Sequence, residues 1–192
     1  MNKTTQTTIY IPRARFESVL DISPEYLQSI GASAVALDID NTLCPDGKFR
    51  CIDGVRDWLA AFADAGIPVT IVSNCTFMRM IPFALYLKLP FVHLAKKPKT
   101  RGLIKAAGMM DTEINKIAMI GDGLFTDVAA ANMCGAIPVR TDPLPWNTTL
   151  YPRYYKRKQQ AETDFIKEHC DIFSNIPYYG SQTTMPPFTP MV

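Results

Sequence analysis

Two aspartates, Asp38 and Asp40, directly follow an apolar run and form the first group of residues that can do chemistry. The run, residues 33–37 (SAVAL), predicts a buried strand. A buried carboxylate without a partner is very costly, and a divalent cation that prefers hard oxygen ligands, such as Mg²⁺, removes that cost. The alternative is a simple Asx turn that ends the strand.

Three further polar residues follow two other predicted strands. Ser73 and Asn74 come after residues 67–72, where a hydroxyl and successive backbone N–H groups can hold phosphate oxygens. Lys97 comes after residues 91–95, where an ammonium can neutralise a phosphate and an attacking carboxylate. The alternatives are ordinary turn chemistry for the first pair and a solvated basic loop for the lysine.

A last acidic pair, Asp122 and Asp127, follows the predicted strand at residues 116–120. Gly121 and Gly123 flank Asp122 and let the backbone turn sharply. A favourable acidic residue at a helix N-terminus is a sound alternative for Asp127, but it explains Asp122 less well.

The elements between these groups alternate between strand and helix. Helices are expected at residues 54–65, 76–87, 100–107 and 125–133, with a fifth strand at residues 136–139. This alternation predicts an α/β fold, a three-layer doubly wound parallel sheet. Because the carboxyl ends of parallel strands meet at one edge, all four polar groups are expected to lie together there.

In this order the groups resemble the haloacid dehalogenase (HAD) superfamily of phosphohydrolases. The pattern is D-x-D-x-T at residues 38–42, then Ser73, then Lys97-Pro98, then G-D-x-x-x-x-D at residues 121–127, and the likeness covers about residues 34–143. Residues 38–43, 95–98 and 121–127 are similar, more narrowly, to the YqeG branch. That branch consists of subfamily III phosphatases and is related to the mitochondrial phosphatidylglycerophosphate phosphatases.

The resemblance implies a role for each residue. Asp38 would be the nucleophile that forms an aspartyl-phosphate, and Asp40 the general acid and base. An aspartate two residues after the nucleophile goes with phosphatases in this superfamily. Four residues would bind the phosphate: Thr42, Ser73, Asn74 and Lys97. Mg²⁺ would be bound by Asp38, the Asp40 backbone carbonyl, Asp122 and Asp127.

The chain is expected to divide into an N-terminal extension with a helix at residues 1–30, a phosphatase domain at 31–145, and a C-terminal helix with a Pro-rich tail at 146–192. The C-terminal helix is expected at residues 155–169 and an irregular tail from residue 176. The gaps between motifs are too short for an inserted cap domain. We therefore expect an open rim, which favours a large substrate, a lipid headgroup or a neighbouring subunit that closes the site.

The composition of the chain limits the kinds of partner that it is expected to bind. With 192 residues, a hydrophobic share of 47% and a net charge of +2, the chain predicts one compact domain and no nucleic-acid partner. The five cysteines lack metal-site spacing and predict reduced thiols in the cytoplasm. Either a helix packed on the sheet or a peripheral membrane contact explains the apolar N-terminal residues Tyr10, Ile11, Phe16, Val19 and Leu20.

The substrate is left open between a lipid headgroup, for which the resemblance implies phosphatidylglycerophosphate as the most specific candidate, a small phosphorylated metabolite and a phosphate on a nucleic-acid end. A homo-oligomer is among the expected partners. The competing hypothesis is a non-catalytic scaffold that retains the HAD fold, and the Tyr- and Pro-rich tail favours it.

Overall fold

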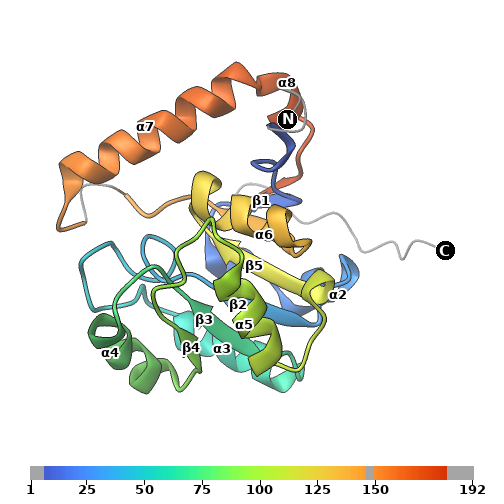
Figure 1. Cartoon of the computed structure of the whole chain (residues 1–192), viewed down its shortest axis with the longest axis vertical. Coiled ribbons are helices and arrows are strands. Elements are labelled where there is room, and N and C mark those ends of the chain that lie inside the picture. The colour runs from blue at the N-terminus through green and yellow to red at the C-terminus, as the bar shows by residue number, and fades with distance from the viewer. Residues whose placement is uncertain (1–6, 146–148, 181–192) are drawn as a thin grey trace.

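The computed structural model describes residues 7–145 and 149–180, and its centre is a seven-stranded parallel sheet (Figure 1). The strands are β1 (Ala14–Phe16), β2 (Ala34–Leu37), β3 (Val69–Val72), β4 (Phe91–Val92), β5 (Ile117–Gly121), β6 (Ile137–Thr141) and β7 (Tyr178–Tyr179). Their order across the sheet is β4-β3-β2-β5-β6-β1-β7, and neighbouring strands run parallel. This confirms the predicted doubly wound α/β fold.

Helices cover both faces of the sheet. They are α2 (Pro24–Ser29), α3 (Val55–Asp64), α4 (Phe77–Leu87), α5 (Arg101–Met109) and α6 (Ala129–Cys134), and they are followed toward the C-terminus by α7 (Pro152–Glu168) and α8 (Cys170–Phe173). Side chains of a strand alternate between the two faces. In β2, Val35 and Leu37 therefore join the core beneath α2, α3 and α4, whereas Ala34 and Ala36 pack with α5 and α6.

Helix α3 shows how the spacing of apolar residues places a helix against the sheet. Its buried residues Val55, Trp58, Leu59 and Phe62 recur at helical spacing and face the sheet. The Trp58 indole N–H donates to the carbonyl of Ile22 at 2.7 Å, so the polar end of this large side chain is satisfied within the core. The helix predicted at residues 54–65 is thus confirmed, with the core packing that its pattern indicated.

The strand order reverses between β2 and β5. From β2 the chain proceeds outward to β3 and β4, and it then returns to place β5 on the other side of β2. The loops that follow β2 and β5 therefore diverge, and ligands of open parallel sheets bind in the crevice that such a reversal creates. Residues 43–54 and 74–90 hold loops and α4, and among the described residues they contain no inserted cap domain.

The N-terminal segment differs in part from its prediction. Its expected helix is present as α2, with Leu27 buried in the core, but residues 14–16 form strand β1, which pairs with β6. Phe16 and Val19 are buried in the core, so they cannot form the proposed exposed membrane contact. The prediction failed because a three-residue strand is too short to show a period.

The C-terminal segment also contributes to the sheet. Tyr178 and Tyr179 of β7 pair with β1 as its outer neighbour, where an irregular tail was predicted from residue 176. The remainder of that predicted tail, residues 181–192, lies outside the described residues. The termini of the described chain therefore meet at one edge of the sheet.

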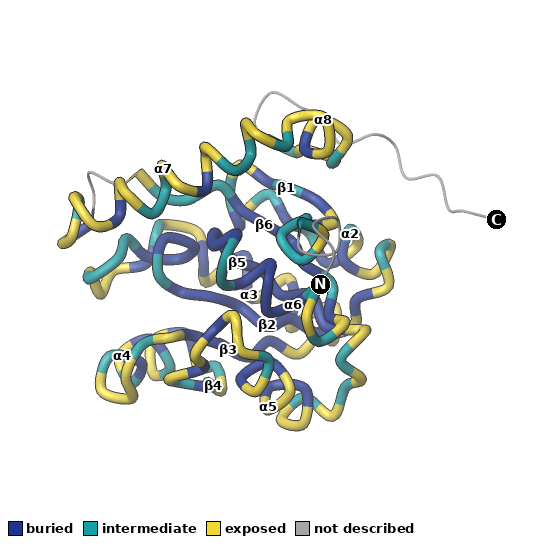
Figure 2. The backbone as a smooth tube through the Cα atoms, turned by 45° about the horizontal axis from the view of Figure 1, so that its top comes forward, coloured by how far each residue is buried: buried dark blue, intermediate teal, exposed yellow. Residues whose placement is uncertain are grey.

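Helix α7 lies outside the two helical layers and has a mostly exposed outer face (Figure 2). It begins with Pro152, a residue favoured in the first turn of a helix, three residues before the predicted start. Only Tyr155 and Glu162 among its residues are buried. In the part of the chain that the structure describes, no helix is long and apolar enough to cross a membrane.

Candidate active site

Three carboxylates meet where the strand order reverses. Asp38 follows β2, Asp122 follows β5, and Asp127 lies in the helical turn Leu124–Val128 just beyond. Each offers an oxygen within 4.8 Å of the oxygens of the other two, and all three residues are buried. The prediction that the ends of β2 and β5 bring these residues together is confirmed.

This acidic cluster has the chemistry of a cation site. The Oδ1 atom of Asp122 is buried and has no hydrogen-bond partner. Buried carboxylate oxygens are expected to have partners, and hard oxygen ligands suit Mg²⁺. Asp38, Asp122 and Asp127 therefore fit a divalent cation.

Two glycines let Asp127 approach the strand end. A Cβ atom on Gly121 would lie 2.5 Å from Oδ2 of Asp127, and one on Gly123 would lie 2.0 Å from Oγ1 of Thr126. The same Oδ2 atom accepts a hydrogen bond from the Gly123 N–H at 2.9 Å. The Gly-Asp-Gly sequence is therefore required by close packing as well as by the turn.

Lys97 places an ammonium inside the acidic cluster. Its Nζ atom lies 2.7 Å from Oδ1 of Asp38, donates to the Val72 carbonyl at 2.7 Å, and forms an ion pair with Asp127. The Asn74 amide holds this residue by its backbone, because Oδ1 accepts from the Lys97 N–H at 2.7 Å and Nδ2 donates to its carbonyl at 3.1 Å. Asn74, predicted to contact phosphate, thus lies where it positions Lys97.

The charges of the cluster are strongly coupled. Burial raises the pKa of Asp38 to about 8, against the effect of Lys97 and in concert with the neighbouring Asp127 and Asp122. Burial lowers the pKa of Lys97, but the carboxylates of Asp127 and Asp38 more than reverse this and raise it to about 12. Even with the Lys158 ammonium 3.5 Å from Asp122, three ionised carboxylates outnumber the ammonium groups beside them, and a divalent cation would offset the remaining negative charge.

The two predicted hydroxyl residues have different surroundings. Oγ1 of Thr42 accepts from the Asp122 N–H at 3.1 Å and so connects the loop after β2 with the loop after β5. Oγ of Ser73 accepts from the Cys75 N–H at 3.1 Å and is buried at the end of β3. The hydroxyl of Thr42 therefore orders the site, while Ser73 lies at the adjacent strand end.

Asp40 is not part of the group of three carboxylates and has other partners. Its carboxylate accepts from the guanidinium of Arg79 and from the Cys75 thiol, the latter at 2.7 Å. Arg79 lies in the first turn of α4, and its guanidinium stacks over the rings of Phe49 and Phe83 at 5.1 Å and 5.6 Å. Sequence reasoning missed Arg79, since no spacing rule connects a single arginine in α4 with the loop after β2.

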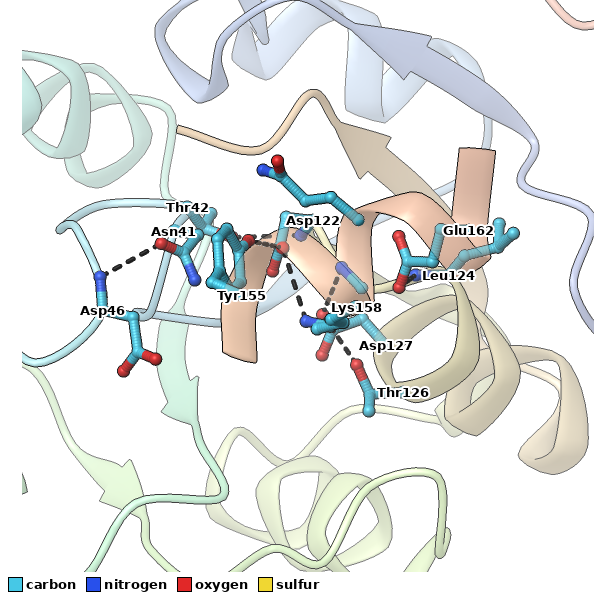
Figure 3. Close-up of polar contacts among 12 residues, drawn as sticks. Asn41, Thr42, Asp46, Asp122, Leu124, Thr126, Asp127, Tyr155, Lys158 and Glu162 are labelled. Carbon is cyan, nitrogen blue, oxygen red and sulfur yellow. Dashed lines mark hydrogen bonds and ion pairs between the residues drawn. The ribbon is translucent and has the colours of Figure 1, made fainter. Parts of the chain in front are cut away.

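The C-terminal helix closes one side of the site, which corrects the expectation of an open rim (Figure 3). The Tyr155 hydroxyl donates to Oδ2 of Asp122, and Nζ of Lys158 lies 3.5 Å from the same oxygen. Burial and the Asp122 carboxylate raise the pKa of Tyr155, so its phenol is a neutral donor. The rim is therefore covered beside Asp122 without any inserted domain.

Glu162 holds α7 in this position. Its Oε1 atom accepts from the Leu124 N–H at 3.0 Å, and its Oε2 atom lies 2.9 Å from the Arg140 guanidinium. Tyr155, Lys158 and Glu162 recur at a spacing of three and four residues, which places them on one face of α7. That spacing is the signal that sequence reasoning passed over, because a charged helix usually has a solvated polar face.

Sequence comparisons find similarity to proteins described as phosphatases. A family model described as mitochondrial PGP phosphatase matches residues 89–144, which include Lys97, Asp122 and Asp127. The probable phosphatase YqeG of Bacillus subtilis (strain 168) is 26% identical over 163 residues, which cover 85% of this chain and 95% of the relative.

Two solved structures are among the matches, and the first has a similar fold. An uncharacterized protein from Corynebacterium glutamicum has a TM-score of 0.50 and 16% identity, with 71% of this chain and 96% of that chain covered. The second is a 3-deoxy-D-manno-octulosonate 8-phosphate phosphatase from Moraxella catarrhalis in complex with a magnesium ion, a phosphate ion and a KDO molecule. It has a TM-score of 0.43 and 15% identity, and the match covers 78% of this chain and 95% of that chain.

Proposed function

Because this chain is similar to YqeG and to the mitochondrial PGP phosphatases, we propose that it is a phosphatase of the haloacid dehalogenase superfamily that hydrolyses phosphomonoesters through a covalent intermediate on Asp38. The observation that carries the proposal is the buried group of three carboxylates with the Lys97 ammonium 2.7 Å from Asp38. Phosphoryl transfer needs chiefly positioning and neutralisation of charge, and this group supplies both.

The residues divide the work as follows. A carboxylate oxygen of Asp38 attacks phosphorus, and the bond from phosphorus to the leaving alcohol breaks. To act as the general acid, Asp40 must first exchange its contact with Arg79 for a proton from solvent. It then gives that proton to the alcohol and takes one from the water that attacks the acyl phosphate, and inorganic phosphate leaves with Asp38 restored. The Lys97 ammonium, beside Asp38, binds a phosphoryl oxygen.

Asp38, Asp122 and Asp127 would hold Mg²⁺, which neutralises charge on the phosphoryl oxygens when bound. The unpartnered Oδ1 atom of Asp122 supports this assignment. Removal of divalent cations with a chelator is expected to abolish hydrolysis, and added Mg²⁺ is expected to restore it. Full activity in the chelator would contradict the metal assignment while leaving the nucleophile untouched.

For the substrate we propose a phosphorylated lipid headgroup, with phosphatidylglycerophosphate first, since the matching family model carries that description. A panel of lipid, sugar and nucleotide phosphates would compare kcat/KM for each class. A preference of at least tenfold for the lipid is expected, or about 1.4 kcal/mol in the transition state. A similar preference for a small phosphorylated metabolite would replace the lipid assignment.

The nucleophile is tested with Asp38→Asn, against Asp64→Asn as a control on the exposed face of α3. Using an aryl phosphate, we expect Asp38→Asn to lower kcat by roughly a thousandfold or more, and the control to match the wild type. Rapid acid quenching of the wild type should leave one phosphoryl group on the peptide that contains Asp38. Near-normal turnover by Asp38→Asn would refute the assignment.

A further inference from the structure

Asp122 is bound at three of its four polar atoms. Its N–H donates to Thr42 at 3.1 Å, and its carbonyl accepts from Nε of Arg140 at 2.9 Å. Its Oδ2 atom accepts from the Tyr155 hydroxyl and, at 3.5 Å, from Lys158. Only Oδ1 has no partner, so the side chain is held with one oxygen directed at bonded groups and the other left for a ligand.

Tyr155 is the best placed of these partners to set the direction of the carboxylate. Its side chain is among the largest that are fully buried, whereas Lys158 remains 27% exposed and lies farther from Oδ2. The helix that carries it is fixed two turns later, where Glu162 bonds to the Leu124 N–H and to Arg140. The phenol oxygen therefore has little freedom to leave the carboxylate.

We propose that Tyr155 is a positioning residue of the metal site: its hydroxyl holds Oδ2 of Asp122 so that Oδ1 faces Asp38 and Asp127. The inference rests on the proposed Mg²⁺ site. Partners that orient the ligands of a metal are as much a part of the site as the ligands are. Tyr155 lies outside residues 89–144, so α7 adds to the site a component that the family match does not contain.

The same contact has an opposite interpretation, in which the hydroxyl competes with the cation for Asp122. A positioning role requires that loss of the hydroxyl weakens Mg²⁺ binding. A competing role requires that its loss strengthens binding. The sign of one measurement therefore separates the two.

The test compares Tyr155→Phe with Tyr154→Phe, since Tyr154 is the adjacent tyrosine and is 68% exposed. Both changes remove one hydroxyl and leave the ring. Calorimetric titration with Mg²⁺ should give a Kd about 10- to 100-fold higher for Tyr155→Phe, with Tyr154→Phe equal to the wild type. An unchanged or lower Kd for a folded Tyr155→Phe would overturn the inference.

A second measurement uses the wild type alone, and it holds even if Tyr155→Phe fails to fold. Coupling between two sites is reciprocal, so an Asp122 carboxylate fixed by Mg²⁺ should also hold Tyr155 and α7 more firmly. Amide hydrogen exchange at residues 152–158 is expected to slow when Mg²⁺ is added. Exchange that stays the same at saturating Mg²⁺ would count against the inference.

Failure of the proposed Mg²⁺ site can be distinguished from failure of the proposed role of Tyr155. If the wild type bound no Mg²⁺, the metal assignment would fail and the role of Tyr155 would fall with it. If the wild type bound Mg²⁺ and Asp122→Asn did not, but Tyr155→Phe bound it normally, only the role of Tyr155 would be lost.

Discussion

Replacement of Glu162 by alanine should detach α7 from the rest of the molecule. Glu162 and Arg140 form an ion pair at 2.9 Å in which the side chains are 3% and 5% exposed. Glu162 is also the acceptor for the buried N–H of Leu124. The substitution removes one member of a buried pair and leaves two donors without their acceptor.

The size of the effect follows from these contacts. Breaking a buried ion pair from one side costs about 3–5 kcal/mol, and an unsatisfied buried N–H costs about 1–3 kcal/mol. The two terms do not simply add, because α7 can move away and let water reach both groups. Phe165 and Ile166 of α7 also pack against a small apolar cluster, and Phe165 contacts the rings of Tyr10 and Phe125, so these contacts still oppose that movement. At the lower end, about 3 kcal/mol, the detached population rises roughly 150-fold.

Amide hydrogen exchange across α7 measures this population directly. The matched control is Glu168→Ala, an exposed glutamate at the end of the same helix with the same change in helix propensity. Glu162→Ala should exchange faster by about two powers of ten within residues 152–168, while β2 and β5 keep the wild-type rate. Equal rates in the two variants would refute the reasoning that this buried pair holds α7.

Two further predictions concern packing and thiol chemistry. Gly102→Ala should lower the free energy of unfolding by about 1–3 kcal/mol in urea titrations, since its Cβ would lie 2.6 Å from that of Ala95. Gly108→Ala, which has open space around it, should raise the free energy of unfolding by up to about 1 kcal/mol. A loss of stability in both variants would contradict the packing argument. At pH 8, mass spectrometry should find that the exposed Cys170 is alkylated well before Cys44, because burial raises the pKa of the Cys44 thiol to about 12. Equal rates of alkylation at the two cysteines would contradict the protection of Cys44 by burial.

The central layers of the fold are predictable because each central strand is a continuous apolar run. β2, β3 and β5 are buried along their whole length, as strands covered on both faces must be. Parallel direction then brings their carboxyl ends to one edge. The meeting of Asp38 and Asp122 follows from these two facts alone.

The outer parts of the fold depend on contacts that no local pattern records. In β1, Ala14 and Phe16 are buried on either side of Arg15, which is too little to show a two-residue period. In α7, a buried tyrosine and a buried glutamate lie among many charged residues, so the helix has the composition of a solvated one. Its bonds to Asp122 and Arg140 join residues far apart in sequence, and only the folded chain brings them together.

The candidate site was likewise predictable in residue type but less so in orientation. Sequence spacing indicates that Asp40 lies at the strand end, yet the direction of its side chain depends on Arg79 in α4. Asn74 is predicted to contact phosphate, and the structure adds hydrogen bonds of its amide with the backbone of Lys97 that the sequence did not indicate. Both outcomes arise because a side chain turns toward the strongest available partner, which can come from any neighbouring element.

The position of β1 has a consequence for biosynthesis. β1 is synthesised first, but its hydrogen-bonding neighbours, β6 and β7, come from the opposite end of the described chain. A nascent chain therefore carries an unpaired β1 while the middle of the sheet forms, and Asp122 gains its contact with Tyr155 only after α7 has been synthesised. A shortened chain that ended before Pro152 would contain Asp38, Lys97 and Asp122 but would lack the hydroxyl that contacts Asp122.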